Sequence, residues 1–427
     1  MNTPMHPTTH AHRAARAAGF TLIELMVAMT LGMLLTAAMA YVYISGRSAF
    51  SRQQQLGSVQ QSVRTAFEYL GNDARMAGHL GCFNGLSTVA TTKFNNNLSA
   101  TSVATNYAIG VEGYEYINAT AGQYTMTSSV PANVTTAGSW RTQLAANGIA
   151  TLPLAAIAGT GSGLTPGSDV LVIRKVSGRP VRLAADANTG SNQTSFTVET
   201  KAAEPGAANC SNGTTARVSG FCTNSHALIA SCSRARIMQI GSIVAGTAPA
   251  ASTLNLAAST NLGNDPIYTP IGAEVFPMQT IAYYVKQSSS GTTTSLYRRI
   301  FDGDLKTPVA GGNDDGLEQE LVEGVESLQI QYGVDTTTPV PNGVVDQYVV
   351  ARGPTGDSTD SVTDWNRVVT IRIGVLVRAT QPIDNDLASA LPASAPVNGV
   401  DIIVPTSGRK FDRRVFTTTV AVRNRIP

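Results

Sequence analysis

The sequence predicts an α+β fold, in which a long N-terminal helix packs on an enlarged head rich in antiparallel strands. Three observations predict it. Residues 20–44 form an apolar stretch of 25 residues with one charged side chain. Apolar residues then recur at helical spacing as far as residue 78. From residue 79 onward, several stretches alternate between apolar and polar side chains, as strands do.

Composition limits the class of protein. The chain has 427 residues, with 30 Lys and Arg against 28 Asp and Glu, which gives a net charge of +2. This balance argues against a nucleic-acid-binding protein, because such proteins usually carry a clear basic excess. It also argues against disorder driven by net charge. The hydrophobic content of 43% is enough for a sizeable core in a chain of this length.

The apolar stretch at residues 20–44 is long enough to cross a membrane. As a helix with a rise of 1.5 Å per residue it spans about 37 Å, and the hydrocarbon core of a bilayer is ~30 Å thick. Arg13 and Arg16 precede it, and no acidic residue does. By the positive-inside rule, residues 1–19 stay in the cytoplasm and the head is exported.

Glu24 is the one charged residue of this stretch, and it distinguishes three interpretations. A secretory signal peptide would be cut after Ala40, where Ala38 and Ala40 form an A-x-A site, and a plain anchor would keep the whole segment. Neither explains an acid in an apolar segment, where a charge costs ~2.5–3.5 kcal/mol at the centre and less near an end. Glu24 could also simply complement the dipole at the N-terminus of the helix.

The string Gly19-Phe20-Thr21-Leu22-Ile23-Glu24-Leu25 closely resembles the signature of type IV prepilins and of type II secretion pseudopilins. The resemblance implies that residues 1–19 are a leader peptide, which a prepilin peptidase removes after Gly19. It also implies that the new terminal residue, Phe20, is N-methylated. Glu24 lies one helical turn away, so its carboxylate can offset the new ammonium charge within the chain or in a neighbouring subunit. Residues 20–44 would then be both the transmembrane helix and the filament-core helix.

Residues 45–78 are predicted to continue as a periplasmic amphipathic helix. Polar side chains alternate with an apolar stripe at i, i+3 and i+4 spacing. Gly78 and Gly81 are expected to end the helix. The stripe consists of Leu56, Val59, Val63, Phe67, Leu70, Ala74 and Ala77.

The head, residues 79–427, is predicted to contain one or more antiparallel sheets. Period-2 alternation indicates strands at 169–176, 328–334, 369–377 and 415–422, and 279–286 with 295–301 reads as a hairpin. Three polar segments have little periodicity and are expected to be long surface loops or insertions with short strands. They are residues 84–165, 243–265 and 380–400.

Four further segments are similar to PilW-type minor pilins, namely residues 72–82, 321–335, 365–378 and 413–425. The place of a PilW-type subunit in its pilus resembles the place of the J-type minor pseudopilin in a type II secretion system. The resemblance implies a subunit that primes type IV pilus assembly and sits at or near the pilus tip. It implies as partners other minor pilins, the major pilin, the prepilin peptidase and a large PilY-type tip adhesin.

All four cysteines follow the membrane segment, on the side where disulfides persist. We favour Cys210–Cys222, which closes a short loop, together with Cys82–Cys232. The alternative of Cys222–Cys232 with Cys82–Cys210 stays open, because spacing does not determine connectivity.

No motif for catalysis is present. The sequence has no G-x-S-x-G, P-loop or H-E-x-x-H pattern and no C-x-x-C pair. His79 and His226 are the two histidines of the head, too few for a zinc site without such a pair. We expect no enzyme activity, cofactor or metal. The weak calcium candidates are the oxygen-bearing residues Asp335, Asn342 and Asp346, and the cluster Asn313–Asp315, for which turn formation is the commoner role.

The sequence therefore predicts a minor pilin that crosses the inner membrane once, with its head in the periplasm, and later joins the pilus. It is expected to contribute to twitching motility and to bind no nucleic acid. One alternative is a J-type minor pseudopilin of a type II secretion system. Another is an adhesive or ligand-binding head on a pilin anchor, and a third is a secreted hydrolase, which Glu24 and the missing catalytic pattern disfavour.

Overall fold

The computed structural model describes residues 21–425 except 84–92, 99–101, 119, 129, 137, 146–147, 155–156, 158–162, 202–209, 211–216, 248–249, 259, 302, 304–317, 355–357, 380, 383–391 and 407–409. The chain divides into two units, Met1–Gln55 and Leu56–Pro427, and each is described by itself.

The described part of the first unit is helical. It contains most of α1, a helix of 54 residues at Leu22–Arg75. The described side chains between Thr21 and Arg47 are all exposed. The segment Leu22–Arg47 is apolar enough to cross a membrane, with a mean hydropathy of 2.0 over its most apolar part.

The second unit begins with the last five turns of α1. The helix ends at Arg75, three residues before the predicted end at residue 78. Met76 and Ala77 donate their amides to Asp73 and Ala74, so the last turn tightens to i, i+3 bonds. Gly78 then takes a φ of +68°, which ends the helix in the way the sequence suggested.

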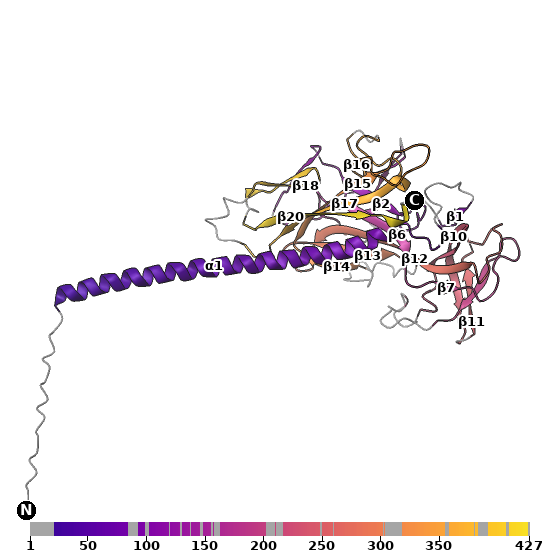
Figure 1. Ribbon diagram of the computed structural model, residues 1–427, viewed down its shortest axis with the longest axis horizontal. Coiled ribbons are helices and arrows are strands. Elements are labelled where there is room, and N and C mark those ends of the chain that lie inside the picture. Colours follow the sequence, from indigo (N-terminus) through magenta and orange to yellow (C-terminus); the bar gives the residue numbers. More distant parts are fainter. Residues whose placement is uncertain are drawn as a thin grey trace, which may run out of the picture. The chain divides into compact units, whose positions relative to one another are not determined.

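Three sheets form the described part of the head (Figure 1). The largest has 13 strands, with the central order β5-β4-β2-β6-β12-β9-β10-β11-β8, and β1, β7, β13 and β14 pair beside this path. Its strands are β1 Phe94–Asn96, β2 Val111–Tyr116, β4 Trp140–Ala145, β5 Gly148–Thr151, β6 Val170–Val176, β7 Val181–Arg182, β8 Ser195–Glu199, β9 His226–Ser231, β10 Arg234–Val244, β11 Ala251–Leu256, β12 Ala273–Gln287, β13 Thr294–Phe301 and β14 Glu318–Glu323.

The two smaller sheets are built mainly from the C-terminal part of the chain. The four-stranded sheet has the order β16-β15-β17-β20 and is antiparallel, and the three-stranded sheet has the order β18-β19-β3. Short 3₁₀ turns lie at Trp365–Arg367 and Arg423–Arg425. The strands are β3 Gln123–Thr125, β15 Val325–Val334, β16 Gln347–Val349, β17 Val368–Arg378, β18 Ser394–Val397, β19 Val400–Ile403 and β20 Arg413–Ala421.

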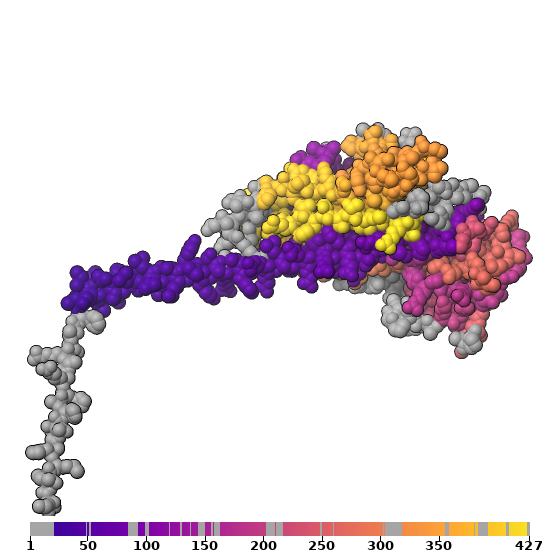
Figure 2. Space-filling view, in the orientation of Figure 1, coloured from indigo at the N-terminus to yellow at the C-terminus, as the bar shows by residue number. Residues whose placement is uncertain are grey.

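The main core joins the C-terminal part of α1 to the 13-stranded sheet and the four-stranded sheet. The predicted apolar stripe of the helix faces this core, and Ala66, Leu70 and Ala74 are fully buried. Strands β6, β12, β15 and β17 supply most of the other side chains. Val420 of β20 also belongs to this core, and Figure 2 shows the yellow C-terminal strand beside this part of α1. The C-terminal part of the helix is therefore part of the core of the head.

The predicted hairpin and strands are confirmed with small changes of boundary. β12 pairs with β13 from Thr280–Phe301 to Gln287–Thr294, and β15 pairs with β17. The alternation predicted at 369–377 places Ile371, Ile373 and Val375 in the main core.

For residues 84–165 we predicted long surface loops or insertions with short strands, and the surface position is wrong for the short strand β2. This strand lies inside the largest sheet between β4 and β6 and is buried along nearly its whole length. It shows no period of two because both of its faces are covered, and polar Glu112 and Glu115 are buried on it. Segment 243–265 likewise contributes β11, whose Leu254 is fully buried in a second core around β8–β11.

Candidate functional site

Glu24 closes a capping box at the N-terminus of α1. Thr21 precedes the helix, and its amide and hydroxyl both donate to Glu24 Oε2 at 3.0 Å. The Glu24 amide donates in return to Thr21 Oγ1 at 3.3 Å. A Thr with a Glu three residues later pairs amides that the first helical turn otherwise leaves free.

Thr21 is a site residue that the sequence analysis did not single out. The pattern Thr-x-x-Glu at the start of an apolar run is itself a sequence signature of a capping box, so this signal was present in the sequence.

The predicted cleavage site, between Gly19 and Phe20, lies outside the described residues. The description begins at Thr21 and the helix begins at Leu22. The bonds to Thr21 hold the Glu24 carboxylate at the N-terminal end of the helix. Cleavage after Gly19 would make Phe20, the residue before Thr21, the new N-terminus.

Two threonines in the apolar part of α1 donate their hydroxyls to the backbone of the same helix. Thr30 Oγ1 donates to the Val27 carbonyl at 2.9 Å, and Thr36 Oγ1 donates to the Gly32 carbonyl at 2.8 Å. Hydroxyls bonded in this way can enter lipid at low cost. A Cβ atom on Gly32 would meet nothing within 4 Å, so this position is open to close approach by another helix.

Asp73 anchors the other end of the helix to the largest sheet. Its Oδ1 lies 2.7 Å from Lys175 Nζ of β6, and its Oδ2 lies 3.1 Å from Arg298 Nη2 of β13. The Tyr283 hydroxyl of β12 also donates to Asp73 Oδ2. The Asp73 side chain is 7% exposed, so these charges are largely removed from water. Three neighbouring strands are thus tied to the last turn of α1.

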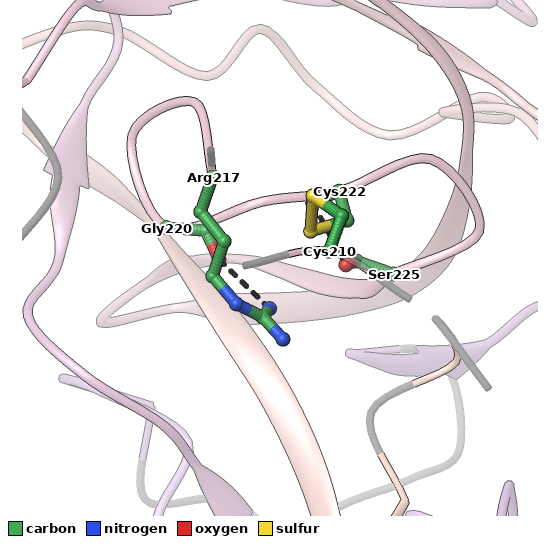
Figure 3. The surroundings of a disulfide bond; sticks show 5 residues. All are labelled: Cys210, Arg217, Gly220, Cys222 and Ser225. Atoms are coloured by element: carbon green, nitrogen blue, oxygen red, sulfur yellow. Dashed lines mark hydrogen bonds between the residues drawn. A yellow bond between two sulfur atoms is a disulfide. The ribbon is translucent and has the colours of Figure 1, made fainter. Parts of the chain in front are cut away.

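The cysteines form the disulfides Cys82–Cys232 and Cys210–Cys222, which is the pairing that we favoured from the sequence. The first joins the segment after the helix to the turn between β9 and β10, and both of its cysteines are exposed. Figure 3 shows the second disulfide. Both of its cysteines are buried, and the Cys222 amide donates to Ser225 Oγ at 3.0 Å.

The side-chain oxygens of the three calcium candidates accept hydrogen bonds from nearby residues. The Asp335 carboxylate accepts from the amides of Thr337 and Gly343, and Asp346 Oδ2 accepts from the amide and hydroxyl of Thr336. Asn342 Oδ1 accepts from the amide of Val344. Burial raises the pKa of Asp335, but these amides outweigh burial and hold its pKa below the ordinary value. These are the bonds of a turn, and the other cluster, Asn313–Asp315, lies outside the described residues.

His226 packs inside the head against Tyr107. It is buried, its Nδ1 lies 2.8 Å from the Tyr107 hydroxyl, and the two rings meet edge to face. Within the described part of the chain, no three His, Cys, Asp or Glu side chains form a group that could hold a metal ion.

Two family models match the chain. A model described as a prokaryotic N-terminal methylation motif matches residues 14–40, and one described as type IV pilus-assembly protein W matches residues 282–424. Together, these two matches support a PilW-type minor pilin of type IV pili. The motif and the apolar helix make it an inner-membrane-anchored pilin that is incorporated into a pilus.

The match to the PilW family covers the C-terminal part of the pilin. It begins within β12 and includes the four-stranded sheet. The strands β1–β11 precede it.

Other comparisons add little. Among solved structures, the type IV-like pilin TTHA1219 from Thermus thermophilus is similar, at 16% identity, covering 35% of this chain and 67% of that chain, with a TM-score of 0.16. No curated protein matches the chain.

Proposed function

We propose that this pilin primes the assembly of a type IV pilus and sits at or near the pilus tip, without catalysing a reaction. The observation that supports priming is the match of residues 282–424 to a family described by pilus assembly. In this chain the matched segment supplies the four-stranded sheet, whose core includes the C-terminal part of α1. A head joined in this way to its helix can dock on other heads while the helices pack together.

In this proposal, the apolar N-terminal part of α1 packs against the helices of neighbouring subunits. Its side chains are exposed and apolar, and Gly32 leaves room for a neighbouring helix. After cleavage, the Phe20 ammonium needs a counter-charge in an apolar environment, and the Glu24 carboxylate provides one in the same chain or in a neighbour. We expect the major pilin and other minor pilins to be these neighbours, and the prepilin peptidase to act first.

The size of the head supports a position at the tip. The strands β7–β11 surround a second core that lies outside the family match. A subunit inside a helical filament must repeat its contacts on every side, whereas a terminal subunit has one free end that accommodates additional bulk. A PilY-type adhesin on that free end would be the further partner.

The test is a strain that lacks the gene and carries either the wild-type pilin or Glu24→Ala. We expect the variant to remain in the inner-membrane fraction while surface pili and twitching motility fall to the level of the deletion strain. Removing the acid eases insertion but leaves the Phe20 ammonium without its partner. Glu68→Ala is the matched control, because Glu68 is an exposed acid of the same helix outside the apolar segment.

Location is tested by immunogold labelling of the wild-type head on sheared pili. Label at filament ends supports the proposal, and label along the whole shaft contradicts the tip position. Normal piliation in the deletion strain would contradict priming. If the deletion instead abolishes secretion of type II substrates, the pseudopilin alternative is correct, and if it abolishes only adhesion, the adhesive head is correct.

A further inference from the structure

Two carboxyl groups face each other in the main core of the head. In the ladder between β2 and β6, Tyr114 pairs with Val170, so Glu115 and Asp169 are the next residues opposite each other. They lie on the face of the ladder that carries Val111 and Leu171 into the main core, since side chains two residues apart share a face. Side chains opposite each other in this way are close neighbours, and like charges there repel.

Both carboxyl groups are buried, and each has an oxygen without a hydrogen-bond partner. These atoms are Glu115 Oε2 and Asp169 Oδ1. Among the described residues, no cation forms an ion pair with either group. Arg141 of β4 is opposite Glu115 in the ladder, but it is exposed and donates to the Gly138 carbonyl. An unpartnered buried polar atom calls for an explanation, such as a bound ion, a water molecule or a proton.

The surroundings of the pair favour one negative charge at most. Tyr332 of β15 places its hydroxyl over Gly113, where a Cβ atom would collide with it, and this hydroxyl is also buried without a partner. Glu112, on the opposite face of β2, is already paired with Arg174 at 2.5 Å. Burial raises the pKa of Glu115 well above its ordinary value and the nearby Asp169 raises it further, although the Ala351 amide opposes the change. Burial raises the pKa of Asp169 to about 7, although the amides of Ile330 and Tyr116 oppose the change.

The pair sits at a junction between two sheets, which we call the seam, formed by Gly167–Asp169 against Ser327–Ile330. The Asp169 amide donates to the Leu328 carbonyl at 2.7 Å, and the Ile330 amide donates to Asp169 Oδ2 at 2.8 Å. Ser327 Oγ donates to the Gly167 carbonyl at 2.9 Å. Because Asp169 is itself hydrogen-bonded across the seam, repulsion from a second negative charge on Glu115–Asp169 would weaken these bonds.

We propose that Glu115 and Asp169 hold one proton between them in the folded head, and that its loss at rising pH loosens the seam. The shared proton gives each unpartnered oxygen a partner, because the protonated carboxyl donates to the ionised one. When the proton leaves, two negative charges face each other across the ladder. Since the fold binds this proton more tightly than the unfolded chain does, its stabilising effect is complete in acid and is lost as pH rises through neutrality.

The test is urea unfolding of the full-length pilin in detergent at pH 5 and pH 8, followed by tryptophan fluorescence. The chain has two tryptophans, and both report on the site. The Trp365 ring lies 4.8 Å from that of Tyr332, and Trp140 Nε1 donates to the Ser168 carbonyl at 2.7 Å. For the wild type we expect the unfolding equilibrium constant to rise at least about tenfold between pH 5 and pH 8.

Glu115→Gln should flatten this pH dependence and make the pilin more stable than the wild type at pH 8, because an amide can donate to an ionised Asp169. Glu68→Gln, which removes an exposed acid, should leave the pH dependence unchanged. An unchanged slope in Glu115→Gln would overturn the proposal. So would a loss of stability on adding EDTA at pH 8 that calcium reverses, because the pair would then hold a cation.

If Glu115→Gln does not fold, the wild type decides the question without a variant. The native fluorescence of Trp140 and Trp365 should change with a midpoint near neutral pH and no urea present. A signal that stays flat between pH 5 and pH 9 would show that the pair does not titrate there.

Discussion

Glu24 has a local partner before any other subunit is present. Its carboxylate is bonded to both the amide and the hydroxyl of Thr21. A capping box accepts Gln as readily as Glu at this position, so capping alone does not require an acid. The negative charge therefore calls for a second reason, and the ammonium that cleavage would create at Phe20 supplies one.

These two roles of Glu24 can be separated by one substitution. Glu24→Gln keeps the hydrogen bonds to Thr21 and removes the charge, so we expect normal amounts of pilin in the membrane and no entry into pili. Thr21→Ala loses the hydroxyl but keeps the charge, and it should still be incorporated. Western blots of membrane and sheared-pilus fractions measure both. Incorporation of Glu24→Gln at the wild-type level would assign capping as the main role.

The mature chain is predicted to begin at Phe20 with a methylated amino group. Gly19 is the small residue before the cut, and the leader before it is basic. The intact mass of pilin extracted from membranes should equal that of residues 20–427 plus one methyl group. A mass that starts at Tyr41 would instead indicate an ordinary signal peptide cut after Ala40 and would contradict the prediction.

Asp73 is expected to matter more for stability than any single hydrogen bond around it. Asp73→Ala leaves Lys175 and Arg298 facing each other without a counter-charge, and breaking a buried ion pair in this way costs about 3–5 kcal/mol. Tyr283→Phe is the control, since it removes one hydrogen bond, worth ~1 kcal/mol. Urea unfolding of the full-length variants measures both, and equal losses would contradict a central role for the charge.

At the scale of elements, the long strand β12 connects two parts of the largest sheet, because it pairs with different strands along its length. Its first part pairs with β7 and β9, and its second part pairs with β6 and β13. Pro277 lies where the pairing with β9 ends, and Met278 begins the pairing with β6. Because proline has no amide proton, it suits a position where a strand exchanges partners. The same proline explains why sequence alternation placed the start of this strand at residue 279 instead of 273.

The two disulfides should differ in their resistance to reduction. Both cysteines of Cys82–Cys232 are exposed, whereas Cys210 is 7% and Cys222 is 1% exposed. A thiolate must reach a sulfur atom to reduce it, so a mild reductant should open Cys82–Cys232 first in the native pilin. Alkylation followed by peptide mass mapping gives the order. Both bonds should open together in 8 M urea, and early labelling of Cys222 without urea would contradict this prediction.

At the scale of the whole molecule, the sequence predicted features that depend on neighbouring residues better than contacts between residues far apart in the chain. Strands such as β15 and β17 were found because one face enters the core and the other is more polar. β2 was missed because its polar residues do not keep to one face. Glu112 and Glu115 are three positions apart, so each face of the strand carries one of them. The N-terminal motif is contiguous, so sequence alone indicated Glu24. The partners of Asp73 come from three separate strands, and no spacing along the chain could have brought them together.

The dependence of the head on its helix gives a last prediction, about where the chain can be shortened. The second unit begins at Leu56, whereas the sequence analysis started the head at residue 79. Val59, Val63 and Leu70 are buried in the main core. Burying each contributes about 1.5–3 kcal/mol, so removing the three costs about 5–9 kcal/mol. A typical domain has only ~5–15 kcal/mol of net stability.

We therefore expect the fragment 56–427, exported to the periplasm behind a cleavable signal peptide, to be soluble and to unfold in one cooperative transition. The fragment 79–427 should aggregate or be degraded, because it exposes the apolar surface that α1 covers and lacks the Asp73 anchor. Circular dichroism and urea unfolding of the two fragments compare them, with residues 46–427 as the longer control. Equal stability of all three would mean that the sheets form their core without the helix, and that α1 is only a membrane anchor.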